Sequence, residues 1–136
     1  FNYFDTAHGY LDGRSETALK ACLTSRYPRE DYVLTNKLTA NFFKTEADIR
    51  PFFESQLKAC GVEYFDFYLM HAQGTTNYQH FKDCRAYETA FALKKEGKVL
   101  LPQNTKNAHE ELIRMGMPIE KGGFGYKTFC KYYNKD

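Results

Sequence analysis

Four polar side chains within the first 71 residues have the types and the spacing for chemistry at a carbonyl group. Asp5, Lys37 and His71 each close a short strand-like segment, and Tyr10 follows Asp5 by five positions in a loop. A hydride that arrives at a carbonyl carbon leaves an alkoxide, to which a phenol such as Tyr10 can give a proton. A buried ammonium nearby stabilises the phenolate that remains, and Lys37 is the candidate. Asp5 would orient that ammonium, while His71 would donate a hydrogen bond to the carbonyl oxygen.

The elements that carry these side chains are predicted to be parallel strands of an α/β fold. The strand-like segments cover residues 1–5, 31–37 and 65–71, and a segment with helical spacing follows each of them. This alternation of hydrophobic period is typical of βα units in a parallel sheet. Functional side chains of such folds gather at the carboxyl ends of the strands. We therefore expect the four polar side chains to cluster at one end of the sheet.

The predicted helices follow from apolar spacing and from end signals. The first begins near Ser15, and its apolar face consists of Leu19, Cys22 and Leu23. The second begins near Asp48, because Pro51 fits only a first turn. The third covers residues 78–96 as one piece, and its apolar stripe includes Phe81, Cys84 and Phe91. A fourth strand is expected to start at residues 99–101.

The pattern changes after residue 101. We expect residues 1–101 to form the βα part, and residues 102–136 to form an atypical segment with a loop at 102–105, a helix at 108–115 and an irregular aromatic end. The glycines at 122–125 match neither the G-x-G-x-x-G pattern after a strand nor a Walker loop. They therefore predict no phosphate-binding loop.

Composition excludes several classes of protein. The 136 residues are 43% hydrophobic and 26% charged with a formal net charge of +2, which describes one ordinary globular domain. The basic residues are spread along the chain, so no nucleic-acid partner is predicted, and no apolar run is long enough for a membrane span. The four cysteines form no C-x-x-C pair, which favours buried reduced thiols and a cytoplasmic location.

Each candidate residue has a plain structural alternative when it is taken alone. Asp5 could cap a strand, Tyr10 could be a loop aromatic, Lys37 a solvated surface group and His71 a satisfied core histidine. Together, four suitable types at three strand ends and one loop favour a reaction site. The remaining polar residues receive structural interpretations: Ser15 as a helix cap, Asp66 as a partner of a helix residue, and His8, His80 and His109 as loop or surface residues.

Several stretches of the chain resemble the aldo/keto reductase family in order and spacing. They are residues 4–10 (FDTAHGY), 34–37 (LTNK), 64–71 (YFDFYLMH) and 94–99 (KKEGKV), within an overall match to residues 1–99. The sequence of residues 60–66 is most similar to that of the prokaryotic branch of predicted oxidoreductases that often carry a ferredoxin-like tail. No cysteine cluster of that kind occurs here, so the resemblance implies no iron–sulfur cofactor.

The resemblance implies an eight-stranded (β/α) barrel that reduces a small-molecule carbonyl substrate with NADPH. It assigns the catalytic positions to Asp5, Tyr10, Lys37 and His71. A typical barrel takes about 250 residues, and the family's first strand and second half, with the loops that hold NADPH, have no counterpart in this sequence. We therefore expect a partial (β/α) barrel, truncated or rearranged, with impaired activity.

Two other interpretations remain open at the level of sequence. A non-catalytic fragment would associate with itself or with a relative through an exposed sheet edge. A different barrel enzyme would use Lys37 for Schiff-base chemistry, as aldolase-type sites do. The residues do not identify the substrate.

Overall fold

The computed structural model of this protein describes residues 1–103. The chain divides into a unit of Phe1–Pro102 and a unit of Gln103–Asp136, and the fold described here is that of the first. The predicted helix at 108–115 and the aromatic end lie outside the described residues. The predicted division after residue 101 stays a prediction.

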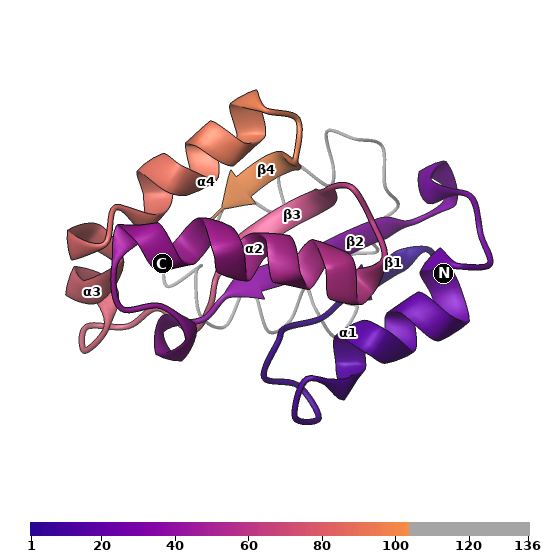
Figure 1. The fold of residues 1–136 in the computed structure, drawn as a ribbon, viewed down its shortest axis with the longest axis horizontal. Helices are drawn as coiled ribbons and strands as arrows, with labels where there is room; N and C mark the ends of the chain where they lie inside the picture. Colours follow the sequence, from indigo (N-terminus) through magenta and orange to yellow (C-terminus); the bar gives the residue numbers. More distant parts are fainter. Residues whose placement is uncertain (104–136) are drawn as a thin grey trace, which may run out of the picture. The chain divides into compact units, whose positions relative to one another are not determined.

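A four-stranded sheet with the order β1-β2-β3-β4 forms the centre of this unit (Figure 1). Its strands are β1 (Tyr3–Asp5), β2 (Val33–Leu38), β3 (Phe65–Met70) and β4 (Val99–Gln103). The β1–β2 and β2–β3 pairs are parallel, as the alternating hydrophobic period predicts. β4 extends further than expected, because Pro102 and Gln103 belong to the strand rather than to a loop.

Helices connect the strands, and α1, α2 and α4 lie on one side of the sheet in Figure 1. The helical elements are α1 (Arg14–Leu19), η1 (Lys20–Thr24), η2 (Arg29–Asp31), η3 (Ala40–Phe42), α2 (Glu46–Cys60), α3 (Tyr78–Asp83) and α4 (Ala86–Lys95). The core between helices and sheet includes Leu34, Phe53, Tyr68 and Leu93, all fully buried. β3 is buried along its whole length, as an almost wholly apolar strand requires. None of the helices in this described part is long and apolar enough to cross a membrane.

The start of α2 differs from its prediction. The helix begins at Glu46, and Thr45 and Asp48 form a capping box that satisfies the free N–H groups of the first turn. Pro51 therefore lies inside the helix, beyond the first turn, on its exposed side. Gly61 ends the helix with φ 69°, a left-handed conformation that glycine adopts without steric cost.

The helix predicted at 78–96 is divided into α3 and α4. The break falls at Cys84 and Arg85, and Arg85 has a left-handed φ of 50°. The two pieces bury faces that would point to opposite sides of one continuous helix, namely Phe81 in α3 and Ala90 in α4. The break turns both faces toward the core. Phe91, expected in the apolar stripe, is 55% exposed for this reason.

The cysteine prediction is only partly correct. Cys60 and Cys84 are buried free thiols, but Cys22 is exposed. Cys22 lies in the π-helical segment η1, which changes the residue spacing after α1, and there Leu23 is the buried residue. Cys130 lies outside the described residues.

Candidate active site

The sheet register brings the predicted site residues together at the carboxyl end of the strands. Asp5 ends β1, Lys37 is the next-to-last residue of β2, and His71 directly follows β3. The Leu38–Met70 pair closes the β2–β3 ladder, and the backbone N–H of His71 donates to the Leu38 carbonyl over 2.9 Å. The predicted strand ends therefore differ by one residue at β2 and β3. The expected carboxyl-edge placement is observed.

Lys37 is the central cation of the cluster. Its ammonium forms an ion pair with the Asp5 carboxylate and donates to the Thr6 carbonyl over 2.9 Å. The residue is only 7% exposed, so these contacts replace most of the water that an ammonium would otherwise bind. Charge-assisted hydrogen bonds of this kind fix the position of a flexible lysine.

Tyr10 reaches the cluster from the loop after β1. The Lys37 ammonium lies over the phenol ring, 4.7 Å from its centroid, within the range of a cation–π interaction. His71 packs against the same ring edge to face, with the centroids 5.8 Å apart. Tyr10 is 39% exposed. The structure therefore places all four side chains in one cluster, and their catalytic roles stay a prediction.

The surroundings of His71 favour a neutral ring. Burial lowers the pKa of His71 below its ordinary value of 6.5, the Lys37 charge acts in the same direction, and the Asp5 carboxylate opposes both. As the pH drops, the His71 ring therefore takes up a proton in the unfolded chain before it does so in the folded one. Folding stability falls as the pH drops below 6.5 toward the folded-state pKa. A neutral imidazole is present above that range and carries a single N–H.

We expect opposite shifts of the His71 titration midpoint in two variants. Lys37→Met removes the charge that lowers the pKa of His71, so the midpoint should rise. Asp5→Asn removes the charge that raises it, so the midpoint should fall. NMR titration of the ring signals checks this, with His71→Gln to assign the resonance. Shifts in the same direction in both variants would contradict the described charge arrangement.

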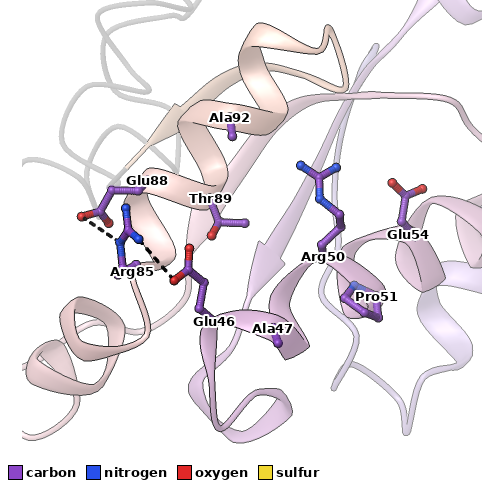
Figure 2. A pocket seen from close by; sticks show the side chains of 9 residues that line it. All are labelled: Glu46, Ala47, Arg50, Pro51, Glu54, Arg85, Glu88, Thr89 and Ala92. Carbon is purple, nitrogen blue, oxygen red and sulfur yellow. Dashed lines mark ion pairs between the residues drawn. The ribbon is translucent and has the colours of Figure 1, made fainter.

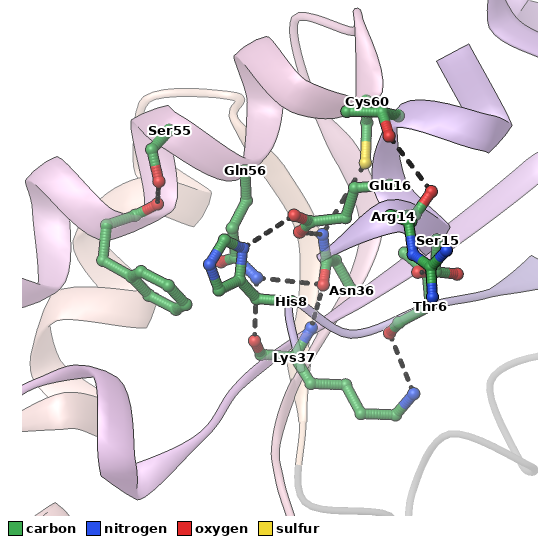
Figure 3. Close-up of polar contacts among 12 residues, drawn as sticks. Thr6, His8, Arg14, Ser15, Glu16, Asn36, Lys37, Ser55, Gln56 and Cys60 are labelled. Atoms are coloured by element: carbon green, nitrogen blue, oxygen red, sulfur yellow. Dashed lines mark hydrogen bonds and ion pairs between the residues drawn. The ribbon is translucent and has the colours of Figure 1, made fainter. Parts of the chain in front are cut away.

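A polar network with a buried carboxylate adjoins Lys37 (Figure 3), and the sequence did not reveal it. Glu16 is fully buried, and its two carboxylate oxygens contact different segments. Oε1 accepts from the Asn36 amide over 2.8 Å, next to Lys37, and Oε2 lies 2.8 Å from Nδ1 of His8, in the loop that carries Tyr10. One carboxylate thus links the two segments that hold Lys37 and Tyr10.

The same network holds the backbone of Lys37. The Asn36 side-chain oxygen accepts from the Lys37 N–H over 2.8 Å, and the Gln56 amide donates to the Lys37 carbonyl over 3.0 Å. The Tyr68 hydroxyl donates to Gln56 over 2.6 Å. Burial raises the pKa of Tyr68 well above its ordinary value, and the Glu16 charge adds to this effect. Tyr68 therefore acts in the network as a neutral donor.

Ser15 does not cap the helix as predicted. The N-cap of α1 is Gly13, with φ 80°. Ser15 instead shares a hydrogen bond of 2.8 Å with the Thr6 hydroxyl, which ties α1 to the end of β1. No local signal in the sequence distinguishes the capping role of Ser15 from its bond to Thr6, because the choice depends on where the loop folds back.

Asp66, expected to pair with a helix residue, accepts a hydrogen bond from Arg29 of η2 over 2.6 Å.

Replacing Glu16 by alanine should destabilise the fold strongly. The Asn36 amide and the His8 ring would lose their shared acceptor in a site that Glu16 fills without any exposure. We expect a loss of about 3 kcal/mol in the free energy of unfolding, typical of a broken buried polar pair. Urea denaturation measures it, with the exposed Glu63→Ala as the matched control. Equal stability of the two variants would show that the network does not hold these segments together.

A surface groove of about 650 Å³ lies elsewhere, between α2 and α4 (Figure 2). Its lining mixes charged side chains with apolar ones, and Arg85 lies 3.5 Å from Glu46 and 4.0 Å from Glu88. Exposed ion pairs of this kind contribute little stability. The groove contains none of the four cluster residues. Within residues 1–103, no group of three or more potential metal ligands comes together.

The model of the aldo/keto reductase family matches residues 1–121. The chain belongs to the aldo/keto reductase family. The recognition made from the sequence stretches is thereby confirmed, and the match reaches further along the chain than the stretches themselves. No curated protein matches this reductase-family chain.

Solved structures agree with this assignment. An aldo-keto reductase from Klebsiella pneumoniae in complex with NADPH is 25% identical, with a TM-score of 0.62, over 76% of this chain and 34% of that one. The same values hold for an aldo/keto reductase from Klebsiella pneumoniae with NADP and acetate. An aldo/keto reductase from Brucella melitensis is 27% identical, with a TM-score of 0.62, over 85% of this chain and 43% of that one.

These comparisons also confirm the predicted fold class. The parallel βα arrangement of the described residues forms part of a (β/α) barrel, the fold of the aldo/keto reductases. The reductase-family chain spans between 34% and 43% of the length of these solved structures.

Proposed function

We propose that the cluster is the reaction centre of an NADPH-dependent reductase that converts a small-molecule carbonyl compound to an alcohol by hydride transfer. One observation carries the proposal: the Lys37 ammonium is held by Asp5 and lies over the Tyr10 ring, against which His71 also packs. An acid (Tyr10), the charge that supports it (Lys37) and a second hydrogen-bond donor (His71) thus lie together at the carboxyl end of the strands. Family membership supports the same reaction class.

Each side chain has a role that its contacts support. The Tyr10 hydroxyl gives its proton to the alkoxide oxygen, and the Lys37 ammonium stabilises the phenolate left behind. Asp5 keeps the ammonium in place through their ion pair. His71, with its pKa lowered by burial, donates a hydrogen bond as a neutral ring to the carbonyl oxygen.

The donor set fits NADPH chemistry, because it provides a proton donor without a competing nucleophile. NADPH, when bound, supplies the hydride. The Klebsiella pneumoniae reductase with a similar fold is described as a complex with NADPH, which supports this cofactor. The glycines of residues 1–103 are all isolated, so the described part offers no glycine-rich loop for the phosphates. We assign no phosphate contact within it.

The contacts of Lys37 favour this role over Schiff-base chemistry. A Schiff-base lysine attacks as a neutral amine, whereas Lys37 donates as an ammonium to a carboxylate and a carbonyl. Self-association through a sheet edge and a cytoplasmic location stay predictions.

Cofactor binding tests the proposal first. We compare this 136-residue chain alone with a barrel completed by the remaining segments of the Klebsiella pneumoniae reductase. The chain alone should bind NADPH at least about 10-fold more weakly, because the phosphates supply much of the binding energy and we assign no phosphate contact in its described part. Fluorescence titration measures both affinities. The impaired activity proposed for the chain alone follows from the same argument. A completed barrel that binds NADPH but reduces no aldehyde would refute the proposed function, and equally tight binding by the chain alone would refute the argument for impairment.

A further inference from the structure

The side chain of Thr39 is placed beside His71 by the sheet itself. Thr39 directly follows β2 and His71 directly follows β3, after the last register pair of the two strands, Leu38 and Met70. The Thr39 hydroxyl oxygen lies 2.7 Å from Nδ1 of His71. The contact therefore rests on the backbone ladder and not on a mobile surface side chain.

The Thr39 hydroxyl has no competing structural role among the described residues. Thr39 is the N-cap residue of η3, a position where a threonine hydroxyl often binds the first turn, yet it makes no side-chain capping bond. Its carbonyl, not its hydroxyl, accepts from the Phe42 N–H over 3.0 Å. The hydroxyl is therefore available to the imidazole.

We infer that Thr39 is a positioning residue, whose hydroxyl donates to Nδ1 of His71 and so keeps the single ring proton on Nε2. This inference rests on the proposed function, because it specifies how His71 comes to donate to the carbonyl oxygen. A neutral imidazole has one donor and one acceptor nitrogen. If Nδ1 carried the proton and donated to Thr39, Nε2 would be an acceptor and would repel the carbonyl oxygen.

Two features of the site support this direction. Among residues 1–103 the hydroxyl proton of Thr39 has no acceptor except Nδ1, so in the reverse arrangement that proton would have no protein partner in this part of the chain. Burial and the nearby Lys37 charge lower the pKa of His71, with the more weakly acting Asp5 opposed to them, so the ring is neutral and its tautomer matters.

NMR of the full 136-residue chain with ¹⁵N-labelled histidine tests the inference and does not require enzymatic activity. At a pH where the ring is neutral, the ¹⁵N shifts should show a protonated Nε2 and an unprotonated, hydrogen-bonded Nδ1 in His71. In Thr39→Val, which has nearly the same shape, the titration midpoint of His71 should rise, because the donor that favours the neutral ring is lost. Thr39→Ser should restore the original midpoint. A proton on Nδ1 in the original chain, or a lower midpoint in Thr39→Val, would overturn the inference.

Activity separates this inference from the proposed function. In a completed barrel, Thr39→Val should lower kcat for an aldehyde about 10-fold, and Thr39→Ser should recover most of it. If the ring proton lies on Nε2 but the completed barrel reduces no aldehyde, the proposed function fails and the tautomer assignment stands. If reduction proceeds with the ring proton on Nδ1, the inference about Thr39 fails and the proposed function stands.

Discussion

Tyr10→Phe is expected to lower carbonyl reduction by the completed barrel roughly 10²–10⁴-fold, the range that general acid catalysis contributes. Phenylalanine keeps the ring that packs against His71 and lies under the Lys37 ammonium, so the cluster should keep its shape. Only the proton donor is lost. The measurement is kcat for a reactive aldehyde with saturating NADPH.

The exposed Tyr27 provides a matched control. Tyr27→Phe makes the same chemical change at a residue that is 56% exposed and outside the cluster, and it should leave kcat unchanged. NADPH affinity should be the same in both variants, which separates loss of chemistry from loss of binding. A Tyr10→Phe enzyme with full turnover would remove Tyr10 from the role of acid.

Lys37→Met is expected to lower turnover roughly 100-fold or more, because the developing phenolate loses the charge that stabilises it. Methionine fills much of the volume of the buried lysine stem, so packing beneath the ring should survive. The change also leaves the Asp5 carboxylate without its partner.

Lys58→Met in the exposed face of α2 controls for the loss of a positive charge. It should leave turnover unchanged. Retention of turnover in Lys37→Met would contradict the role of the ammonium. Borohydride treatment that links a carbonyl substrate to Lys37 would contradict it in a different way, by showing that this lysine forms a covalent bond.

The sequence was sufficient for the features that depend on short-range pattern. Apolar runs identified the strands, and polar residues at their ends identified the edge where Asp5, Lys37 and His71 meet. Tyr10 follows Asp5 by five positions in a loop, and the structure places its ring against His71 at the same end of the sheet. The roles of these residues in catalysis still await the measurements above.

The features that the sequence missed depend on contacts between distant segments. In the sequence, Glu16 is an ordinary acidic residue of a first helical turn. In the structure it is fully buried, and its two oxygens contact the His8 ring and the Asn36 amide. The break at Arg85 was missed because the apolar spacing across it fits one continuous helix. In the structure, α3 and α4 bury different faces, and only a break allows both faces to pack on the core. In each case tertiary packing overrides the local signal.

The most direct test of the proposed reaction follows the hydride itself. A completed barrel would be given an aldehyde and NADPH that carries deuterium at the transferred position, and the alcohol would be analysed by mass spectrometry. We predict one deuterium on the carbinol carbon and one alcohol formed for each NADPH oxidised. Alcohol without deuterium, or NADPH oxidised without alcohol, would contradict hydride transfer at the Asp5–Tyr10–Lys37–His71 cluster.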